Sequence, residues 1–164
     1  MPLRHYYLGN RSIRRDAPYK RKIIYNDMKI AVDFDGTIVE HRYPEIGKEV
    51  PFATVTLRKL IDEGHKLILW SVREGKLLDE AVAWCEKRGV HFYAVNKDFD
   101  EDTPEKSRNF SRKIKADLFI DDRNVGGLPD WGVIYTLVHR RMSYLDYLNS
   151  LQDEPVRKKK WWQF

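Results

Sequence analysis

Residues 30–39, IAVDFDGTIV, begin as a buried strand and end with two acids. The first three residues are apolar, as expected of a strand inside a sheet. Asp33 and Asp35 follow directly, and the Asp-Gly pair is typical of a turn. Carboxylates at the end of a buried strand are unfavourable unless a cation or another polar group compensates them. This stretch therefore predicts a strand that ends at a cation-binding site.

The sequence on either side alternates between strand and helix patterns. The predicted strands are rich in apolar and β-branched residues, and they cover 29–34, 66–71, 91–95, 116–121 and 132–138. The predicted helices have one apolar face, and they cover 51–64, 77–89, 108–115 and 144–151, the last capped by Ser143. This alternation indicates an α/β fold, with a mainly parallel five-stranded sheet and helices on both of its faces.

The composition is that of a folded globular protein. The chain has 164 residues, of which 42% are hydrophobic and 34% charged, and this length suits a single domain. No run approaches the roughly 20 apolar residues of a membrane span, so we expect no membrane partner. The single cysteine, Cys85, cannot form an internal disulfide. This favours a reducing compartment, and we expect the protein in the cytoplasm.

The net charge of +5 is confined to the two ends of the chain. Residues 1–27 contain seven Lys or Arg residues and two Asp residues, and residues 155–164, PVRKKKWWQF, contain four Lys or Arg residues. The chain therefore divides into a basic N-terminal extension, a mildly acidic domain at 28–154 and a basic, aromatic C-terminal tail. Such ends could bind nucleic acid, but they are more often solvated, and we do not expect this partner.

Polar side chains follow three of the predicted strands, at the edge of the sheet where groups that bind ligands usually collect. They are Asp33, Asp35, Ser71, Arg73, Asp121, Asp122 and Arg123. Four carboxylates at one edge repel one another and need a cation. Oxygen ligands favour Mg²⁺, and no group of Cys and His residues suggests zinc. The sequence therefore predicts a magnesium site.

Four motifs in this order resemble those of the haloacid dehalogenase (HAD) superfamily, most of whose members are phosphatases. DFDGT, which begins at Asp33, is similar to the first motif, and Ser71 at the end of LILWS is similar to the second. Lys113 in SRKIKADLFIDD is similar to the third, and Asp121 and Asp122 in IDDR are similar to the fourth. The resemblance covers nearly the whole domain and implies a three-layer, Rossmann-like fold.

The resemblance also implies a role for each acid. Asp33 would attack phosphorus and form an aspartyl-phosphate, while Asp35 would protonate the leaving group and then activate water. Mg²⁺ would be held by the Asp33 carboxylate, the Asp35 backbone carbonyl and an acid of the Asp121–Asp122 pair. Which of these two acids contacts the metal is left open by the sequence.

Phosphate oxygens would be bound by the Ser71 hydroxyl and the Lys113 ammonium, again as the resemblance implies. Lys113 is chosen because its spacing before IDD matches small relatives with a KPxAD-type third motif, although the proline is absent here. The lysines that compete with it for this role are Lys97, Lys106 and Lys115.

Other residues near the motifs are candidates for contacts with the rest of the substrate. The loop after the first motif contains His41, Arg42 and Tyr43, which could meet the leaving group. Arg73 and Arg123 each follow a motif residue closely, and each either holds an anionic substrate or pairs with a neighbouring acid.

The gaps between the motifs are too short for the cap domain that HAD enzymes usually carry. We therefore expect a capless, Mg²⁺-dependent phosphomonoester hydrolase acting on a phosphorylated substrate. Sugar phosphates, nucleotides and phosphorylated polymer ends all fit an open site, and an oligomer is compatible with the sequence. The alternative is a non-catalytic protein that binds phosphate or nucleic acid on a HAD scaffold.

Overall fold

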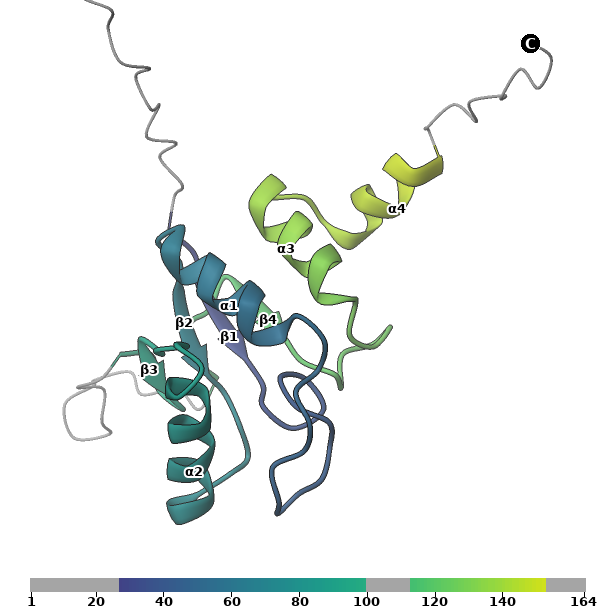
Figure 1. The fold of residues 1–164 in the computed structure, drawn as a ribbon. Coiled ribbons are helices and arrows are strands. Elements are labelled where there is room, and N and C mark those ends of the chain that lie inside the picture. The colour runs from purple at the N-terminus through teal and green to yellow at the C-terminus, as the bar shows by residue number, and fades with distance from the viewer. Residues whose placement is uncertain (1–26, 100–112, 153–164) are drawn as a thin grey trace, which may run out of the picture.

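The computed structural model describes residues 27–99 and 113–152. Within these ranges the chain forms an α/β fold with one parallel sheet of four strands and with four helices (Figure 1). In chain order the elements are β1 Lys29–Val32, α1 Ala53–Asp62, β2 Lys66–Leu69, α2 Gly75–Glu86, β3 Ala94–Val95, β4 Leu118–Ile120, α3 Trp131–Arg140 and α4 Tyr144–Gln152. The predicted N-terminal extension, the C-terminal tail and most of the predicted helix at 108–115 lie outside the described residues.

The strands lie in the order β3-β2-β1-β4, and every pair is parallel. Val32, the last residue of β1, pairs with Leu69 of β2 and with Ile120 of β4. The three strands therefore end level with one another. Because side chains that follow level, parallel strands meet at one edge, this register brings together segments far apart in the sequence.

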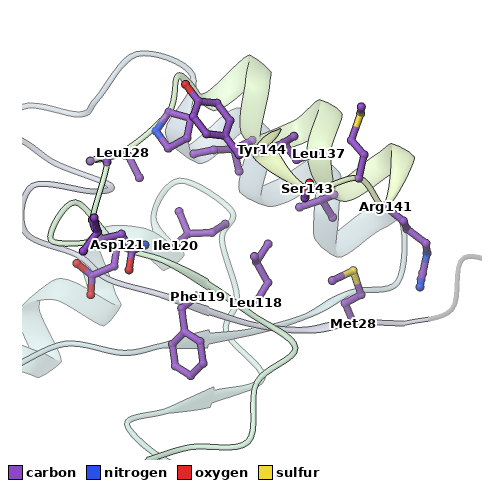
Figure 2. A pocket seen from close by; sticks show the side chains of 18 residues that line it. Met28, Leu118, Phe119, Ile120, Asp121, Leu128, Leu137, Arg141, Ser143 and Tyr144 are labelled. Carbon is purple, nitrogen blue, oxygen red and sulfur yellow. The ribbon is translucent and has the colours of Figure 1, made fainter. Parts of the chain in front are cut away.

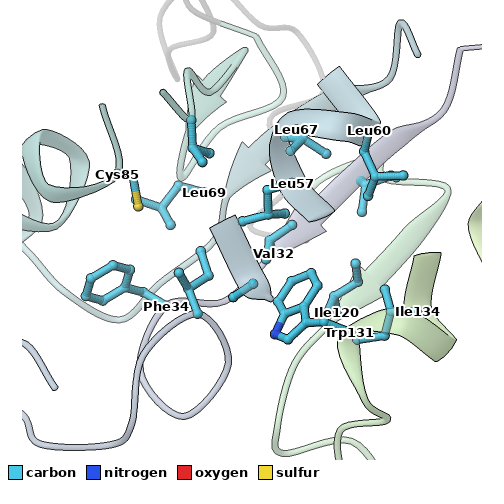
Figure 3. Packing of buried hydrophobic residues seen from close by; sticks show 14 of the residues in the cluster. Val32, Phe34, Leu57, Leu60, Leu67, Leu69, Cys85, Ile120, Trp131 and Ile134 are labelled. Carbon is cyan, nitrogen blue, oxygen red and sulfur yellow. The ribbon is translucent and has the colours of Figure 1, made fainter. Parts of the chain in front are cut away.

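One face of the sheet carries the main hydrophobic core (Figure 3). Side chains alternate between the two faces of a strand, so residues two positions apart share a face. This core joins residues of β1, β2 and β4 to α1, α2 and α3. Its buried members include Val32, Leu57, Leu60, Leu69, Cys85 and Trp131. Helices α1, α2 and α3 therefore all cover the same face.

The opposite face has a smaller cluster, formed by Ala31, Ile68, Ala94 and Ile114. Trp70, Ala116 and Phe119 pack against it, and among the described residues no helix contributes to it. The prediction of helices on both faces, and thus of three layers, is not confirmed within these residues. The parallel α/β architecture itself is confirmed and is compatible with a Rossmann-like fold.

Residues 132–138 form a helix, so the prediction of a fifth strand there was wrong. The run is apolar and β-branched, and a short run of this kind fits a buried helix as well as a strand. The Asp130 side chain caps α3 by accepting a hydrogen bond from the Gly132 amide, at 2.7 Å. Trp131, Ile134 and Val138 are the buried residues, a spacing that places them on one helix face.

The last helix, α4, begins as predicted, directly after Ser143. The Ser143 hydroxyl accepts a hydrogen bond from the Asp146 amide at 3.1 Å, and it donates to the Asp146 carboxylate at 2.7 Å. None of the residues of α4 is buried, and Figure 1 shows the helix beyond α3, away from the sheet. No helix in the described part of the chain is both long and apolar enough to cross a membrane.

Candidate metal and phosphate site

Three carboxylates meet at the edge where β1 and β4 end. Asp33 follows β1, and Asp121 and Asp122 follow β4. One oxygen from each of these residues lies within 4.8 Å of the other two. The backbone supports this approach, since the Asp33 amide donates a hydrogen bond to the Ile120 carbonyl at 3.0 Å. The level register of the two strands thus places the first and fourth motifs side by side.

The charge of Asp33 is disfavoured by its surroundings. Burial is the largest cause, and repulsion by Asp121 and Asp122 acts in the same direction; together they raise the pKa of Asp33 to about 6. A hydrogen bond from the Phe34 amide and one from the Thr37 hydroxyl lower the pKa, but they do not cancel these effects. The ionised form of Asp33 is therefore less favourable here than in water, and a cation bound beside it would favour that form.

Asp122 presents an oxygen that is available to a ligand. Its Oδ1 is buried, and it has no hydrogen-bond partner among the described residues. The carboxylate lies directly against the backbone of Gly36, where a Cβ atom would overlap it. Gly36 also has a φ of +91°, a conformation that side chains disfavour. An unpartnered carboxylate oxygen in an all-carboxylate cluster fits a hard cation such as Mg²⁺.

Thr37 connects Asp33, which follows β1, to Asp122, which follows β4; the sequence alone did not assign it this role. Its hydroxyl donates to Asp33 Oδ2 at 3.3 Å and accepts a hydrogen bond from the Asp122 amide at 3.0 Å. Its carbonyl accepts the indole N–H of Trp131 at 3.2 Å, which connects the site to α3. Thr37 is the last residue of DFDGT, so its place in the motif was the signal for this role.

Asp35 lies beside the cluster but pairs with an arginine. Its Oδ2 accepts a hydrogen bond from Arg73 Nε at 2.6 Å, and its Oδ1 accepts one from Arg73 Nη2 at 2.7 Å. Both side chains are buried. Of the two alternatives for Arg73, substrate contact or pairing with a neighbouring acid, the structure shows the pairing.

Ser71 is held at the same edge by Asn96, a second residue that the sequence analysis did not single out. The Ser71 amide donates to Asn96 Oδ1 at 2.8 Å, and Asn96 Nδ2 donates to the Ser71 carbonyl at 2.9 Å. Asn96 directly follows β3 and has a φ of 53°. A polar residue directly after the predicted strand at 91–95 was the signal for this role.

A cavity of about 150 Å³ opens at this edge. It is lined by Asp33, Asp35, Trp70, Ser71, Val72, Asp121 and Arg123. Arg123 is exposed, and its amide donates a hydrogen bond to Asp121 Oδ1 at 2.8 Å. The cavity therefore combines acids, a hydroxyl and one guanidinium, which is a suitable lining for an anionic substrate that binds together with a metal ion.

Lys113 is not among the residues that line this cavity. Its ammonium lies 6.0 Å from the ring centroid of Phe119, whose side chain packs with the smaller cluster on the opposite face of the sheet. Phosphate binding by Lys113 stays a prediction.

The three loop residues proposed to meet the leaving group are all exposed. Arg42 borders a separate cavity of about 410 Å³, together with Glu40, Glu45 and Lys48. The ring centroid of Tyr43 lies 5.3 Å from the guanidinium carbon of Arg73. His41 is likewise exposed, and a contact between any of the three and a substrate stays a prediction.

A larger cavity, of about 450 Å³, lies between β4, α3 and the start of α4 (Figure 2). Its lining is mainly apolar and includes Met28, Leu118, Leu137 and Tyr144. Asp121 borders both cavities. The smaller cavity is the better candidate for a reaction, because it contains the titratable and anion-binding groups.

Comparison with known proteins gives a family but no activity. No family model matches the chain, and no curated protein matches it. Among solved structures, a conserved protein from Bacteroides thetaiotaomicron is 64% identical in sequence, with a TM-score of 0.69. The match covers 74% of this chain and 98% of that one. The chain therefore belongs to the same family as this conserved protein.

Proposed function

We propose that this protein is a Mg²⁺-dependent phosphomonoester hydrolase of the HAD type. The observation that carries the proposal is the meeting of Asp33, Asp121 and Asp122, with one oxygen from each within 4.8 Å of the others. Asp33 also lines the cavity that contains Ser71 and Arg123. A nucleophilic carboxylate, a cluster able to hold a divalent cation and groups able to bind an anion are thus adjacent.

The reaction proceeds in two steps that use the two acids of the first motif. Asp35 enters the first step protonated. Asp33 attacks phosphorus, the bond to the leaving oxygen breaks, and Asp35 gives its proton to this oxygen. Asp35 then takes a proton from water, whose oxygen attacks the aspartyl-phosphate. The bond between phosphorus and Asp33 breaks, inorganic phosphate leaves, and both carboxyl groups return to their starting states.

Mg²⁺ would be held by carboxylate oxygens of Asp33, Asp121 and Asp122 and by the Asp35 backbone carbonyl. When bound, the ion supplies positive charge that offsets the repulsion between the carboxylates and an anionic phosphate. Two observations support the fit, namely the Asp122 Oδ1 atom, which has no hydrogen-bond partner in the described part of the chain, and the raised pKa of Asp33. The Ser71 hydroxyl and the exposed Arg123 guanidinium would bind phosphate oxygens, and Lys113 is a further candidate for this role.

The test is phosphate release from a panel of phosphomonoesters, with Mg²⁺ or with a chelator. The panel should include aryl, sugar, nucleotide and alkyl phosphates. We expect turnover that requires Mg²⁺ and falls by at least about 1,000-fold in Asp33→Asn, because that substitution removes the nucleophile. Asp62→Asn, a matched change at an exposed acid of α1, should keep full activity.

Two results would count against the proposal. Turnover that persists in the chelator, or that Asp33→Asn retains, would exclude the proposed mechanism. A folded protein that binds Mg²⁺ but hydrolyses no member of the panel would favour the alternative of a non-catalytic phosphate-binding protein.

A further inference from the structure

Arg73 is a fully buried arginine in the loop between β2 and α2. Arginine is rarely buried unless its charge is paired, because removing a guanidinium from water is costly. Here the hydrogen bond to Asp35 is the largest effect on Arg73, and it raises the pKa of the guanidinium above its ordinary value. Arg73 therefore remains charged throughout the physiological range of pH.

The contact with Asp35 is bidentate, and it fixes the orientation of the carboxylate. Arg73 Nε and Nη2 each donate to a different oxygen of Asp35, at 2.6 and 2.7 Å. Two parallel bonds to a planar guanidinium define the plane of the carboxylate as well as its position. Each carboxylate oxygen has two lone pairs, so one lone pair on each remains for exchange of a proton with a ligand in the cavity.

The remaining donors of Arg73 hold the loop that follows the first motif. Nη1 donates to the Pro44 carbonyl and Nη2 to the Glu45 carbonyl, both at 2.9 Å. The rings of Phe34 and Tyr43 also lie near the guanidinium carbon, with centroids at 5.2 and 5.3 Å. One guanidinium thus connects Asp35 to the loop at 43–45.

Direct contact between Arg73 and a substrate does not fit this arrangement. Four of its five N–H groups already donate to Asp35, Pro44 and Glu45, and none of its surface is exposed. Arg123 is the exposed guanidinium that lines the cavity. An effect of Arg73 on the reaction must therefore pass through the groups it holds.

We propose that Arg73 is a positioning residue that orients Asp35 for proton transfer to the leaving group and fixes the loop at 43–45 beside it. This inference rests on the proposed phosphatase function and deepens it. Asp35 is buried, so only a narrow range of orientations points a lone pair into the cavity. The bidentate contact selects the orientation of the Asp35 carboxylate. The hydrogen bonds to the Pro44 and Glu45 carbonyls hold the loop at a fixed position beside it.

The test compares two substrates whose leaving groups need a proton to different degrees. Nitrophenolate leaves readily without protonation, whereas an alkoxide must be protonated as it leaves. The value to measure is kcat/KM for p-nitrophenyl phosphate and for the best alkyl phosphate of the panel, since kcat/KM reports only the steps up to cleavage of the ester. The ratio of the two values does not depend on how much of a preparation is folded, so a loss of stability in the variant does not obscure it.

In Arg73→Lys, which keeps the charge but loses the bidentate contact, we expect kcat/KM for the alkyl ester to fall about 100-fold or more, and for the nitrophenyl ester less than about 10-fold. Asp35→Asn should change the ratio in the same direction. Adding Arg73→Lys to Asp35→Asn should produce no further change in the ratio, because the ratio reports protonation of the leaving group and the acid that Arg73 positions for this step is already absent. Arg58→Lys, at an exposed arginine of α1, is the matched control.

An equal loss for both esters in Arg73→Lys would overturn the inference, since it would indicate a general structural role. A further change in the ratio when Arg73→Lys is added to Asp35→Asn would also overturn it, because Arg73 would then affect departure of the leaving group by a route other than Asp35. A wild-type protein that hydrolyses the nitrophenyl ester but no alkyl ester would contradict this inference while leaving the phosphatase proposal intact. A wild-type protein inactive on both esters would remove the phosphatase proposal and this inference together.

Discussion

Asp33 lies where burial and two neighbouring acids both oppose its charge. A carboxyl group whose pKa is raised on folding binds its proton more tightly in the folded protein than in the unfolded chain. Between about pH 4 and pH 6, the unfolded chain has lost this proton while the folded protein keeps it. The contribution of Asp33 to the free energy of unfolding therefore falls as pH rises through this window, and it stays low above pH 6.

The first prediction follows from this loss of stability with rising pH. In the metal-free protein, Asp33→Asn should increase the free energy of unfolding at pH 7 by about 1–2 kcal/mol, a value discounted for partial solvent screening. The gain should shrink as pH falls from 6 to 4 and vanish below about pH 3, where Asp33 is protonated in both states. Urea unfolding of both proteins at several pH values, in a chelator, measures the difference.

At pH 7, saturating Mg²⁺ should make wild type more stable than Asp33→Asn, the reverse of the order expected without metal. An ion that binds only the folded state at 100 times its Kd stabilises that state by about 2.7 kcal/mol. Wild type should gain this stability, and Asp33→Asn should gain less. Equal gains in the two proteins would contradict the assignment of Asp33 as a metal ligand.

The second prediction concerns Gly36, whose backbone lies against the Asp122 carboxylate. Gly36→Ala should abolish stabilisation by Mg²⁺, because the added Cβ would displace this carboxylate. Gly64→Ala is a matched control, since Gly64 has a φ of +93° and, its chain neighbours aside, no atom of the described residues lies within 4 Å of the position of a Cβ. Both variants should lose about 1 kcal/mol from backbone strain alone. Thermal unfolding with and without Mg²⁺ separates strain from the loss of the site, and equal responses to Mg²⁺ in the two variants would contradict the role of Gly36.

At the level of single residues, the acids of the site could be found from the sequence but their supports could not. Asp33, Asp121 and Asp122 stand out because carboxylates directly after apolar strands are unusual. Thr37 and Asn96 are common residue types in turns, and their roles depend on hydrogen bonds to atoms more than 20 residues away. No local pattern carries that information.

At the level of elements, most helices and strands followed from periodicity. The run at 132–138 did not, and residues 113–115, the described part of the predicted helix at 108–115, are not helical. Helix α3 forms over the run at 132–138 because Asp130 caps it and because its buried face completes the core with Trp131. The same residues would satisfy a strand pattern, so the choice depends on tertiary packing, which the sequence does not show directly. Trp131 in turn donates a hydrogen bond to Thr37, so α3 also supports the site.

The third prediction compares the caps of α3 and α4. Asp130→Ala should lower the free energy of unfolding by about 1 kcal/mol, as loss of an N-cap usually does. Ser143→Ala removes an equivalent cap, but α4 has no buried residues, so we expect fraying of that helix with a global change of less than about 0.5 kcal/mol. Urea unfolding measures both values. Equal losses would show that α4 is part of the cooperative unit.

At the level of the whole molecule, the topology explains why the site forms. Parallel strands in the order β3-β2-β1-β4 end level, and the residues that follow them converge at one edge. Two observations were enough to predict this convergence: strands alternate with helices along the sequence, and groups that bind ligands collect beyond the carboxyl ends of parallel strands. The distribution of helices between the two faces could not be predicted, because each amphipathic helix fits either face until its neighbours are known.

The central claim is that Asp33 becomes phosphorylated during turnover, and its phosphorylated form can be sought directly. The best preparation is Asp35→Asn mixed with p-nitrophenyl phosphate and Mg²⁺, because this ester needs no proton to be cleaved and hydrolysis of the intermediate lacks its base. After an acid quench, mass spectrometry should find a phosphoryl group on the peptide that contains Asp33, only when Mg²⁺ is present. Turnover of the ester with no phosphoryl group on Asp33, or with one on another residue, would contradict the account.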